Sequence, residues 1–243
     1  MPIRCITFDL DDTLWDCMPV IHRAEQTFHE WLSAHYPRIA ERYDHDAMVA
    51  HRKAWFARFP ELHHDLTTLR KRWLALIARE SGYDETLVEP AFRVFWEARN
   101  RVALYDDVTD TLERLKPRYR LGAITNGNAD VHRIGIGHHF DFVVTAARVG
   151  VAKPHPEIFT AALDEAGTAA HETLHVGDDP VRDVAGAAAV GLRTLWVNPR
   201  ADITPKGCTP DGVVYSVGEV VEWVESSPHI SPGSREQAKD SCS

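Results

Sequence analysis

The sequence predicts an α/β fold in which a parallel sheet is interrupted, after its first strand, by a helical insertion. Strand-like apolar runs recur along the chain with helix-compatible segments between them, which is the pattern of βαβ units. Residues 16 to 102 break this alternation, because they show helical spacing without a strand. A length of 243 residues suffices for one core that carries a large insertion.

The first predicted strand is "IRCITFDL" (3–10), which is apolar along most of its length, as expected for a strand covered on both faces. Similar runs follow later in the chain. They are "YRLGAITNG" (119–127), "FDFVVTA" (140–146), "ETLHVGD" (172–178) and "LRTLWVN" (192–198). Polar or glycine-containing turns end several of these runs at the expected carboxyl edge, where open parallel sheets bind their ligands.

Crossover helices are predicted between these strands. They cover 107–116, which stops before Pro117, 156–167, and 180–190, which stops before Gly191.

The insertion shows apolar residues on one helical face, with Trp31 and Trp73 among them. Its histidines show no repeated HxxxH or Cys/His spacing. We therefore expect these tryptophans to pack in the core of the insertion, and we expect no zinc site there. The polar, turn-rich segment 226–243 is expected to be a loose tail.

Composition and charge narrow the functional classes. Apolar residues make up 44% and charged residues 26%, an ordinary globular balance. The formal charge of -9 argues against a nucleic-acid binder, which displays a basic face. The four cysteines form no CxxC pair, and no apolar run approaches a membrane span. We expect a cytoplasmic protein with neither nucleic-acid nor membrane partners, as a monomer or a homodimer.

Three acidic residues stand directly behind the first strand, in "FDLDDTLW" (8–15). If the strand continues, Asp9 and Asp11 leave it on the same side. Two carboxylates in one pocket are unfavourable unless a divalent cation neutralises them, and an oxygen-rich site prefers Mg²⁺. Asp178, at the end of another predicted strand, is placed to complete such a site. Asp12 is expected to cap the turn or helix that follows.

Groups suited to phosphate follow two other strands. Thr125, in "ITNGN", offers a hydroxyl beside loop amides, and Lys153 precedes Pro154 at a rigid helix entry. A cation, a hydroxyl and amides can share one phosphoryl group. For Asn126 two interpretations stay open, an ordinary turn residue or an additional contact to substrate.

The motifs "FDLDDTLW", "ITNGN", "AKPHPEIF" and "HVGDDPVRD" together resemble, in this order, the four motifs of the haloacid dehalogenase (HAD) superfamily. The insertion resembles the helical C1 cap of its subfamily I. This resemblance covers nearly the whole chain before the tail. It implies a Rossmann-like core of residues 1–15 and 103–225, a helical cap of residues 16–102, and a flexible C-terminal tail of residues 226–243.

The resemblance also implies a role for each matching residue. Asp9 is the implied nucleophile and Asp11 the implied general acid/base, with an aspartyl-phosphate intermediate. The implied ligands of Mg²⁺ are Asp9, the Asp11 carbonyl and Asp178. The remaining implied roles are phosphate binding by Thr125, Asn126 and Lys153, orientation of Asp11 by Thr13, and support of Lys153 or metal-bound water by Asp183 and Asp179.

Phosphomonoester hydrolysis of a small phosphorylated metabolite is the activity that these roles imply. The 2-haloacid dehalogenases share the scaffold but lack the second acid and the magnesium, so Asp11 and Asp178 favour phosphate chemistry. A phosphosugar mutase stays open, since an aspartyl-phosphate can pass to a sugar hydroxyl. A phospho-receiver signalling module carries similar groups but lacks the long cap and the second acid.

A closer resemblance suggests a substrate. The segments "FDLDDTLWDCMPVIHRAE", "ITNGNAD" and "LHVGDDPVRDVAGA" are similar to those of bacterial HAD phosphatases that act on FMN and on 5-amino-6-(5-phospho-D-ribitylamino)uracil. Trp15 and the tryptophans of the cap are then available, on this hypothesis, to stack on a flat heterocycle.

Overall fold

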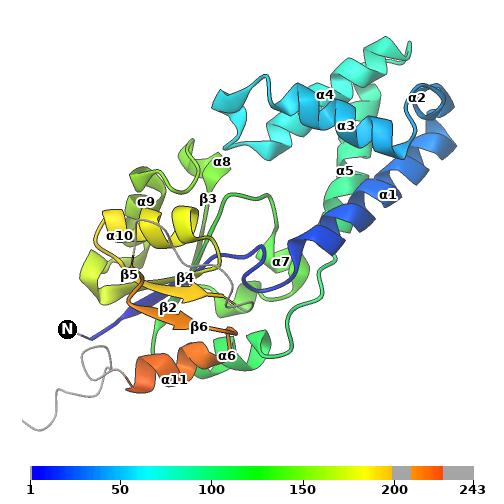
Figure 1. Cartoon of the computed structure of the whole chain (residues 1–243). Coiled ribbons are helices and arrows are strands. Elements are labelled where there is room, and N and C mark those ends of the chain that lie inside the picture. Colours follow the sequence, from blue (N-terminus) through cyan, green and yellow to red (C-terminus); the bar gives the residue numbers. More distant parts are fainter. Residues whose placement is uncertain (1, 199–208, 227–243) are drawn as a thin grey trace, which may run out of the picture.

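The computed structural model describes residues 2–198 and 209–226 and contains one parallel sheet of six strands (Figure 1). The spatial order of the strands is β3-β2-β1-β4-β5-β6. Their bounds are β1 Cys5–Phe8, β2 Arg120–Thr125, β3 Phe142–Thr145, β4 Thr173–Gly177, β5 Arg193–Val197 and β6 Gly212–Val214. Cys5 is in register with Arg120 on one side and with Thr173 on the other. The segments that follow β1, β2 and β4 therefore leave one edge of the sheet side by side.

Helices cover both faces of the sheet. Ile6 and Phe8 of β1 belong to the same apolar cluster as α6 (Val108–Leu115) and α11 (Glu219–Ser226). Cys5 belongs to a second cluster, with α9 (Pro156–Ala166) and α10 (Gly186–Ala189). Burial on both faces accounts for the continuous apolar runs in the sequence and confirms the predicted α/β parallel-sheet fold.

Short helical elements complete the part of the chain around the sheet. They are α7 Val131–Ile134, η3 Gly137–His139, α8 Ala146–Val149, η4 Ala170–Glu172 and η5 Pro180–Ala185.

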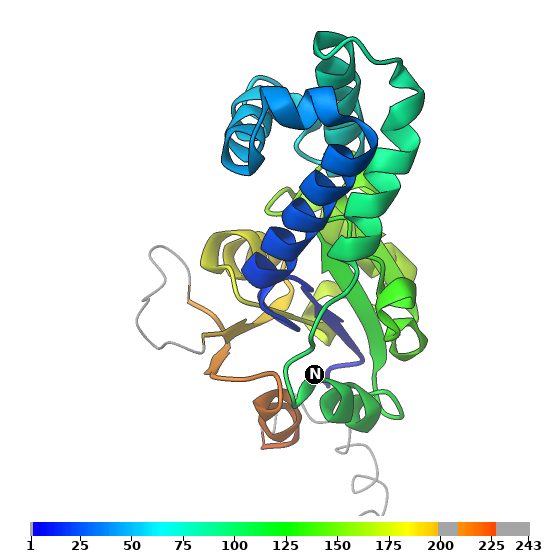
Figure 2. The ribbon, with the colours of Figure 1, turned by 90° about the vertical axis from the view of Figure 1, so that its right-hand side faces the viewer.

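The helices between β1 and α6 form a unit of their own, which stands away from the sheet (Figure 1). Within it, α1 and α5 run side by side away from the sheet (Figure 2). Its elements are α1 Cys17–His35, α2 Pro37–Arg42, α3 His45–Phe56, η1 Pro60–Leu62, α4 Leu66–Glu80, η2 Glu85–Leu87 and α5 Val88–Arg99. No helix in the described part of the chain is both long and apolar enough to cross a membrane.

The helical unit has a separate apolar core. Trp73 is fully buried among Phe28, Phe95 and other residues of this unit, and Trp31 packs against the same cluster. The prediction that these two tryptophans belong to the core of the insertion is therefore confirmed.

The structure differs from the sequence prediction in the last third of the chain. The predicted helix 180–190 is two elements, because a wide π turn, in which the amide of Val184 reaches the carbonyl of Asp179 at 3.2 Å, precedes α10. The strand β6 and the helix α11 were not predicted. Of the predicted tail, only Ser226 lies within the described residues, where it ends α11.

Candidate active site

A cavity of about 300 Å³ opens where the segments after β1, β2 and β4 meet. Apart from Thr13, every residue predicted for the site lines it. Those residues are Asp9, Asp11, Thr125, Asn126, Lys153, Asp178, Asp179 and Asp183. Cys17 of α1 and Leu66 of α4 line it as well, so the helical unit supplies part of the wall.

Lys153 is the centre of a buried charge cluster in this cavity. Its Nζ donates to Asp9 Oδ1 at 2.5 Å, to Asp183 Oδ1 at 2.7 Å and to the carbonyl of Ile124 at 2.9 Å. The residues Asp9, Lys153 and Asp183 are only 8%, 4% and 1% exposed. Three acceptors use the three protons of the ammonium group, which fixes its position.

The two carboxylates that share the lysine have pKa values shifted in opposite directions. Burial alone would lower the pKa of Lys153, but Asp183 and Asp9 outweigh it and raise that pKa. Burial would raise the pKa of Asp183, but Lys153 and His175 hold it well below its usual value. Burial raises the pKa of Asp9 more than Lys153 lowers it, and Asp183 raises it further. The same ammonium therefore outweighs the effect of burial at Asp183 but not at Asp9.

His175 supports the cluster from inside the sheet. Its Nε2 lies 3.2 Å from Asp183 Oδ1, and its Nδ1 lies 2.9 Å from the hydroxyl of Thr7. Burial lowers the pKa of His175, so the ring is neutral. Both contacts are satisfied when Nε2–H donates to Asp183 and the Thr7 hydroxyl donates to Nδ1.

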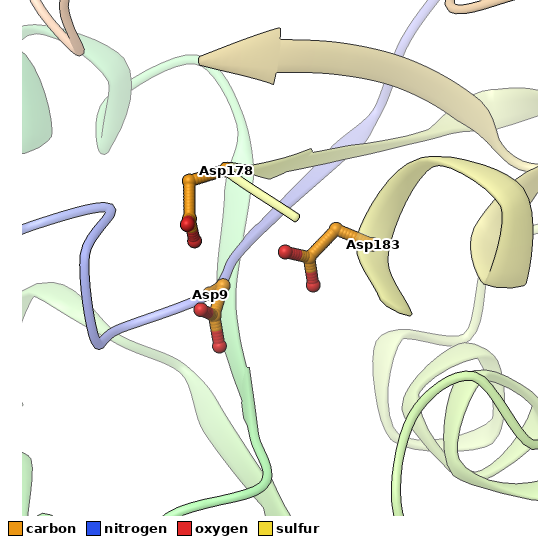
Figure 3. A group of neighbouring side chains, drawn as sticks. All are labelled: Asp9, Asp178 and Asp183. Carbon is orange, nitrogen blue, oxygen red and sulfur yellow. The ribbon is translucent and has the colours of Figure 1, made fainter. Parts of the chain in front are cut away.

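The carboxylates of Asp9, Asp178 and Asp183 point into a common space (Figure 3), and one oxygen of each lies within 4.8 Å of the others. Burial, with Asp183 and then Asp12 adding to it, raises the pKa of Asp178 to about 7. Three ionised carboxylates and one ammonium leave two negative charges, which a divalent cation would balance. The hard oxygen donors suit Mg²⁺. Because Asp183 already accepts from Lys153, His175 and the amide of Asp179, the donors best placed for an ion are Asp9 and Asp178.

Asp11 lies apart from these three acids. Arg99 Nη2, from the end of α5, donates to both of its carboxylate oxygens at 2.6 Å, and Trp15 Nε1 donates to Oδ1 at 2.9 Å. The carboxylate lies at the boundary between the sheet and the helical unit.

Thr13 and Trp15, two residues predicted near Asp11, have contacts other than those expected. Thr13 was expected to orient Asp11, but its hydroxyl turns inward and donates to Asp178 Oδ1 at 3.1 Å. Trp15 was expected to offer a stacking surface, but it is fully buried in the core beneath the sheet edge. A ring in that position cannot meet a substrate.

The loop after β2 is tied to the segment that carries Lys153. The carboxamide of Asn126 accepts from the amide of Lys153 at 2.7 Å and donates to its carbonyl at 3.0 Å. The hydroxyl of Thr125 accepts from the amide of Gly127 at 3.0 Å. A side chain at Gly127 would place Cβ only 2.7 Å from Asp11 Oδ2, so this close approach requires glycine.

Asp12 and Asp179 act as local caps. Asp12 has φ +62°, and its side chain accepts from the amide of Cys17 at 2.8 Å, as expected for a capping residue. Asp179 accepts from the amides of Val181 and Arg182, both at 2.8 Å. The contacts of Asp179 thus favour the capping interpretation over support of Lys153.

Sequence reasoning missed Arg99 and His175. Arg99 stands 88 positions from Asp11, at the end of a helix with no motif around it. His175 lies within an otherwise apolar strand. Only the tertiary fold brings Arg99 to the site, whereas His175 opens the motif HVGDDPVRD and lies eight residues before Asp183.

Comparison with known proteins supports the motif interpretation. Residues 3–191 match the family of haloacid dehalogenase-like hydrolases. The 5-amino-6-(5-phospho-D-ribitylamino)uracil phosphatase YigB of Escherichia coli K12 is 33% identical over 201 residues, which cover 81% of this chain and 84% of that protein. The phosphoserine phosphatase of Thermus thermophilus is 29% identical over 250 residues, with coverage of 90% and 98%.

A solved structure gives the same result for the fold. The crystal structure of a 2-haloacid dehalogenase from Pseudomonas syringae pv. Tomato DC3000 superposes with a TM-score of 0.85 at 36% identity, and the match covers 90% of this chain and 97% of that one. The family match, the identity to YigB and this superposition agree with the predicted resemblance. The chain belongs to the haloacid dehalogenase-like hydrolases and is an enzyme of that family.

Proposed function

We propose that this hydrolase is a Mg²⁺-dependent phosphatase, which cleaves a small phosphomonoester through an aspartyl-phosphate at Asp9. The observation that supports it is that Asp9 and Asp11 open on one cavity together with Lys153, Thr125 and Asp178. A nucleophile, a second acid, a cation and a metal-type donor set are what phosphoryl transfer requires. The named phosphatase activities of YigB and of the Thermus relative support the same class.

Asp9 performs the first chemical step in this proposal. One of its carboxylate oxygens attacks phosphorus, and the bond between phosphorus and the leaving alcohol oxygen breaks as the new bond forms. Lys153, held by Asp183 at 2.7 Å, exchanges its contact with Asp9 for one with a phosphoryl oxygen. The Thr125 hydroxyl donates to another, where the negative charge of the transition state is greatest.

Asp11 moves the protons. It gives a proton to the leaving alcohol oxygen and then takes one from the water that hydrolyses the aspartyl-phosphate, which restores Asp9. Arg99 and Trp15 fix its carboxylate for both transfers. A magnesium ion held by Asp9, Asp178 and the Asp11 carbonyl would neutralise phosphoryl charge and help align the phosphoryl group for attack.

For the substrate, the similarity of the motif segments to bacterial HAD phosphatases supports FMN, and the name of the YigB relative supports the related phosphometabolite 5-amino-6-(5-phospho-D-ribitylamino)uracil. The buried position of Trp15 removes one contact that was expected to recognise a flavin ring. A steady-state panel of phosphate esters separates the cases: if sugar phosphates are hydrolysed far faster than FMN, the flavin-type substrate is excluded.

Dehalogenation is the second candidate, because the superposed Pseudomonas syringae structure carries that name. Asp178 and the second acid Asp11, which phosphate hydrolysis uses, argue against it. Halide release from 2-chloropropionate, measured beside phosphate release from p-nitrophenyl phosphate, decides between the two. Halide release without phosphatase activity would overturn the proposal.

The central experiment locates the intermediate. The enzyme is mixed with p-nitrophenyl phosphate and Mg²⁺, quenched in acid and reduced with borohydride, which converts an acyl phosphate of aspartate to homoserine. Peptide mass spectrometry should find homoserine at position 9, and EDTA should abolish both turnover and labelling. Labelling at another residue would exclude Asp9 as nucleophile, and a complete lack of hydrolysis would favour a signalling role.

A further inference from the structure

A second cavity, of about 220 Å³, lies beside Asp11 between the sheet edge and the helical unit. It shares Asp11, Cys17, Leu66 and Gly127 with the catalytic cavity and so continues it on the side of Asp11. We call it the arginine pocket; its other lining residues are Ile21, Arg52, Phe56, Arg70, Phe95, Arg99 and Asn128. If Asp11 protonates the leaving oxygen, the rest of the leaving alcohol extends into this pocket.

Positive charge exceeds negative charge around the arginine pocket. Glu25 pairs with Arg70 at 2.6 Å and with Arg52 at 2.9 Å, while Asp11 pairs with Arg99. Three guanidinium groups thus share two carboxylates. Burial lowers the pKa of Arg70, Glu25 opposes this and Arg52 adds to it, so that the pKa reaches about 10. An anion in the pocket would balance the third cation.

Two arginine donors in this pocket are unsatisfied. Within the described part of the chain, Arg99 Nη1 and Arg52 Nε are buried without a hydrogen-bond partner. The side chains of Arg99 and Arg52 are only 2% and 11% exposed. Buried donors are normally paired, because a buried donor without a partner has lost its hydrogen bonds to water and gained none in return. Both residues line the same cavity, so a group bound there lies beside both side chains.

Aromatic rings of the helical unit pack against the guanidinium groups of Arg70 and Arg52. Arg70 lies over the ring of Phe95, 3.3 Å from its centroid, and Arg52 lies 5.2 Å from that of Phe56. Ile21 and Leu66 add apolar surface. The volume is below the roughly 300–1,000 Å³ of pockets that take drug-sized ligands. A short carbon chain that ends in an anion fits these walls.

We propose that the enzyme selects phosphomonoesters whose leaving alcohol is short and carries a carboxylate, which Arg52 and Arg99 bind. This inference rests on the proposed phosphatase function but replaces the flavin-type substrate, because the leaving alcohol of FMN is too large for this pocket and carries no carboxylate. Planar guanidinium groups recognise a carboxylate by paired, charge-assisted hydrogen bonds. Arg52 comes from α3 and Arg99 from α5, so the bound carboxylate also bridges two elements of the helical unit.

Matched pairs of substrates test the selectivity. Phosphoserine and phosphoethanolamine differ only by the carboxylate, and phosphoglycolate is compared with ethyl phosphate. We expect kcat/KM to be at least ~10-fold higher for the carboxylate-bearing member of each pair, because only that member can form hydrogen bonds with the two buried arginine donors. Equal kcat/KM values within both pairs would overturn the inference while leaving the phosphatase proposal intact.

Arg52→Gln tests the residue itself. Gln keeps a polar group near Glu25 but removes the charge, so the ratio of kcat/KM within each pair should fall by ~10-fold. Arg79→Gln is the matched control, because Arg79 lies on α4 of the same helical unit with its side chain 62% exposed. An unchanged ratio in Arg52→Gln, or an equal fall in Arg79→Gln, would contradict the assignment.

Binding of glycolate, followed by calorimetry, gives a readout that does not depend on turnover. Glycolate should bind the wild type and the Arg79→Gln variant, and binding should be lost in Arg52→Gln. Glycolate binding in an enzyme that hydrolyses no phosphate ester would sustain the pocket and refute the phosphatase proposal. Absence of glycolate binding to the wild type would refute the pocket.

Discussion

Arg99 Nη2 lies 2.6 Å from each carboxylate oxygen of Asp11 and joins the end of α5 to the loop after β1. The residue proposed as the proton shuttle is thus held by a side chain of the helical unit. The orientation of Asp11 and the position of these helices depend on each other through one buried guanidinium group.

Replacement of Arg99 should therefore affect the chemical step more than the binding of a small phosphomonoester whose leaving group is uncharged. In Arg99→Met we expect kcat for ethyl phosphate to fall by ~10²-fold, the low end of the contribution of a general acid/base, with a smaller change in KM. Arg99→Lys should recover part of the loss, because it keeps the charge. The combination of Arg99→Met with Asp11→Asn should be little worse than Asp11→Asn alone, since the two residues act as a unit. A rise in KM with kcat unchanged would contradict this role.

Asp9→Asn should abolish turnover, because an amide cannot form the acyl phosphate. We expect kcat to fall by about 10⁴-fold or more, as for other lost nucleophiles. Circular dichroism should show an unchanged fold. Asp12→Asn is the matched control: the side chain of this neighbouring acid accepts from the amide of Cys17 and takes no part in the proposed chemistry, so the variant should keep most of the activity. Loss of activity in both variants with an intact fold would count against the distinct role of Asp9.

Removal of Lys153 should destabilise the protein as well as inactivate it. Lys153→Met leaves Asp9 and Asp183 buried without their cation, and we expect the free energy of unfolding to fall by ~3–5 kcal/mol. Adding Asp183→Asn should restore part of the stability but none of the activity. Urea denaturation measures both, with Lys116→Met as control.

Lys116 pairs with Asp141 at 2.8 Å on the surface, so that control should cost less than ~1 kcal/mol. An Lys153→Met variant as stable as the control would show that the buried cluster does not need its cation.

Asp178 should make Mg²⁺ binding depend on pH. Its pKa rises from 3.8 to about 7 on folding, so in the absence of metal the stability it contributes is greatest below pH 3.8 and is lost as the pH rises toward 7. A metal ligand must be deprotonated, so the contribution of Asp178 to the Mg²⁺ affinity should rise by about tenfold per pH unit below 7 and then level off.

Melting temperatures in MgCl₂ and in EDTA, measured from about pH 5 to pH 9, test this dependence. The difference between the two conditions should grow with pH up to neutrality and should be nearly absent in Asp178→Asn. A difference that is independent of pH would exclude Asp178 as the titrating ligand.

Local sequence patterns predicted the parts of the site that stand beside strand ends. Asp9, Thr125 and Asp178 follow apolar runs, and parallel pairing of β1, β2 and β4 brings such positions together. The sheet was predictable for the same reason, because each buried strand is continuous in sequence. The three-residue strand β6 was not, since so short a run carries little periodicity.

Contacts that cross between distant segments could not be predicted. The arginine pocket depends on how α3, α4 and α5 pack above the sheet, and no spacing along the chain encodes that packing. The contacts of Thr13 and Trp15 were not predicted for a related reason, because the tight turn after β1 decides which side chains face inward. Asp12, with φ +62°, marks that turn.

Trp15 forms bridges with both Asp11 and Leu104, and the amide of Tyr105 donates to the carbonyl of Leu14 at 3.0 Å. The segment that leaves the sheet and the one that returns to it are therefore joined through their backbones at Trp15, whose side chain is buried. A hinge motion of the helical unit at these segments would take place beside Asp11, whose carboxylate accepts from the indole N–H of Trp15. A change in the position of the helical unit would therefore act directly on the orientation of Asp11.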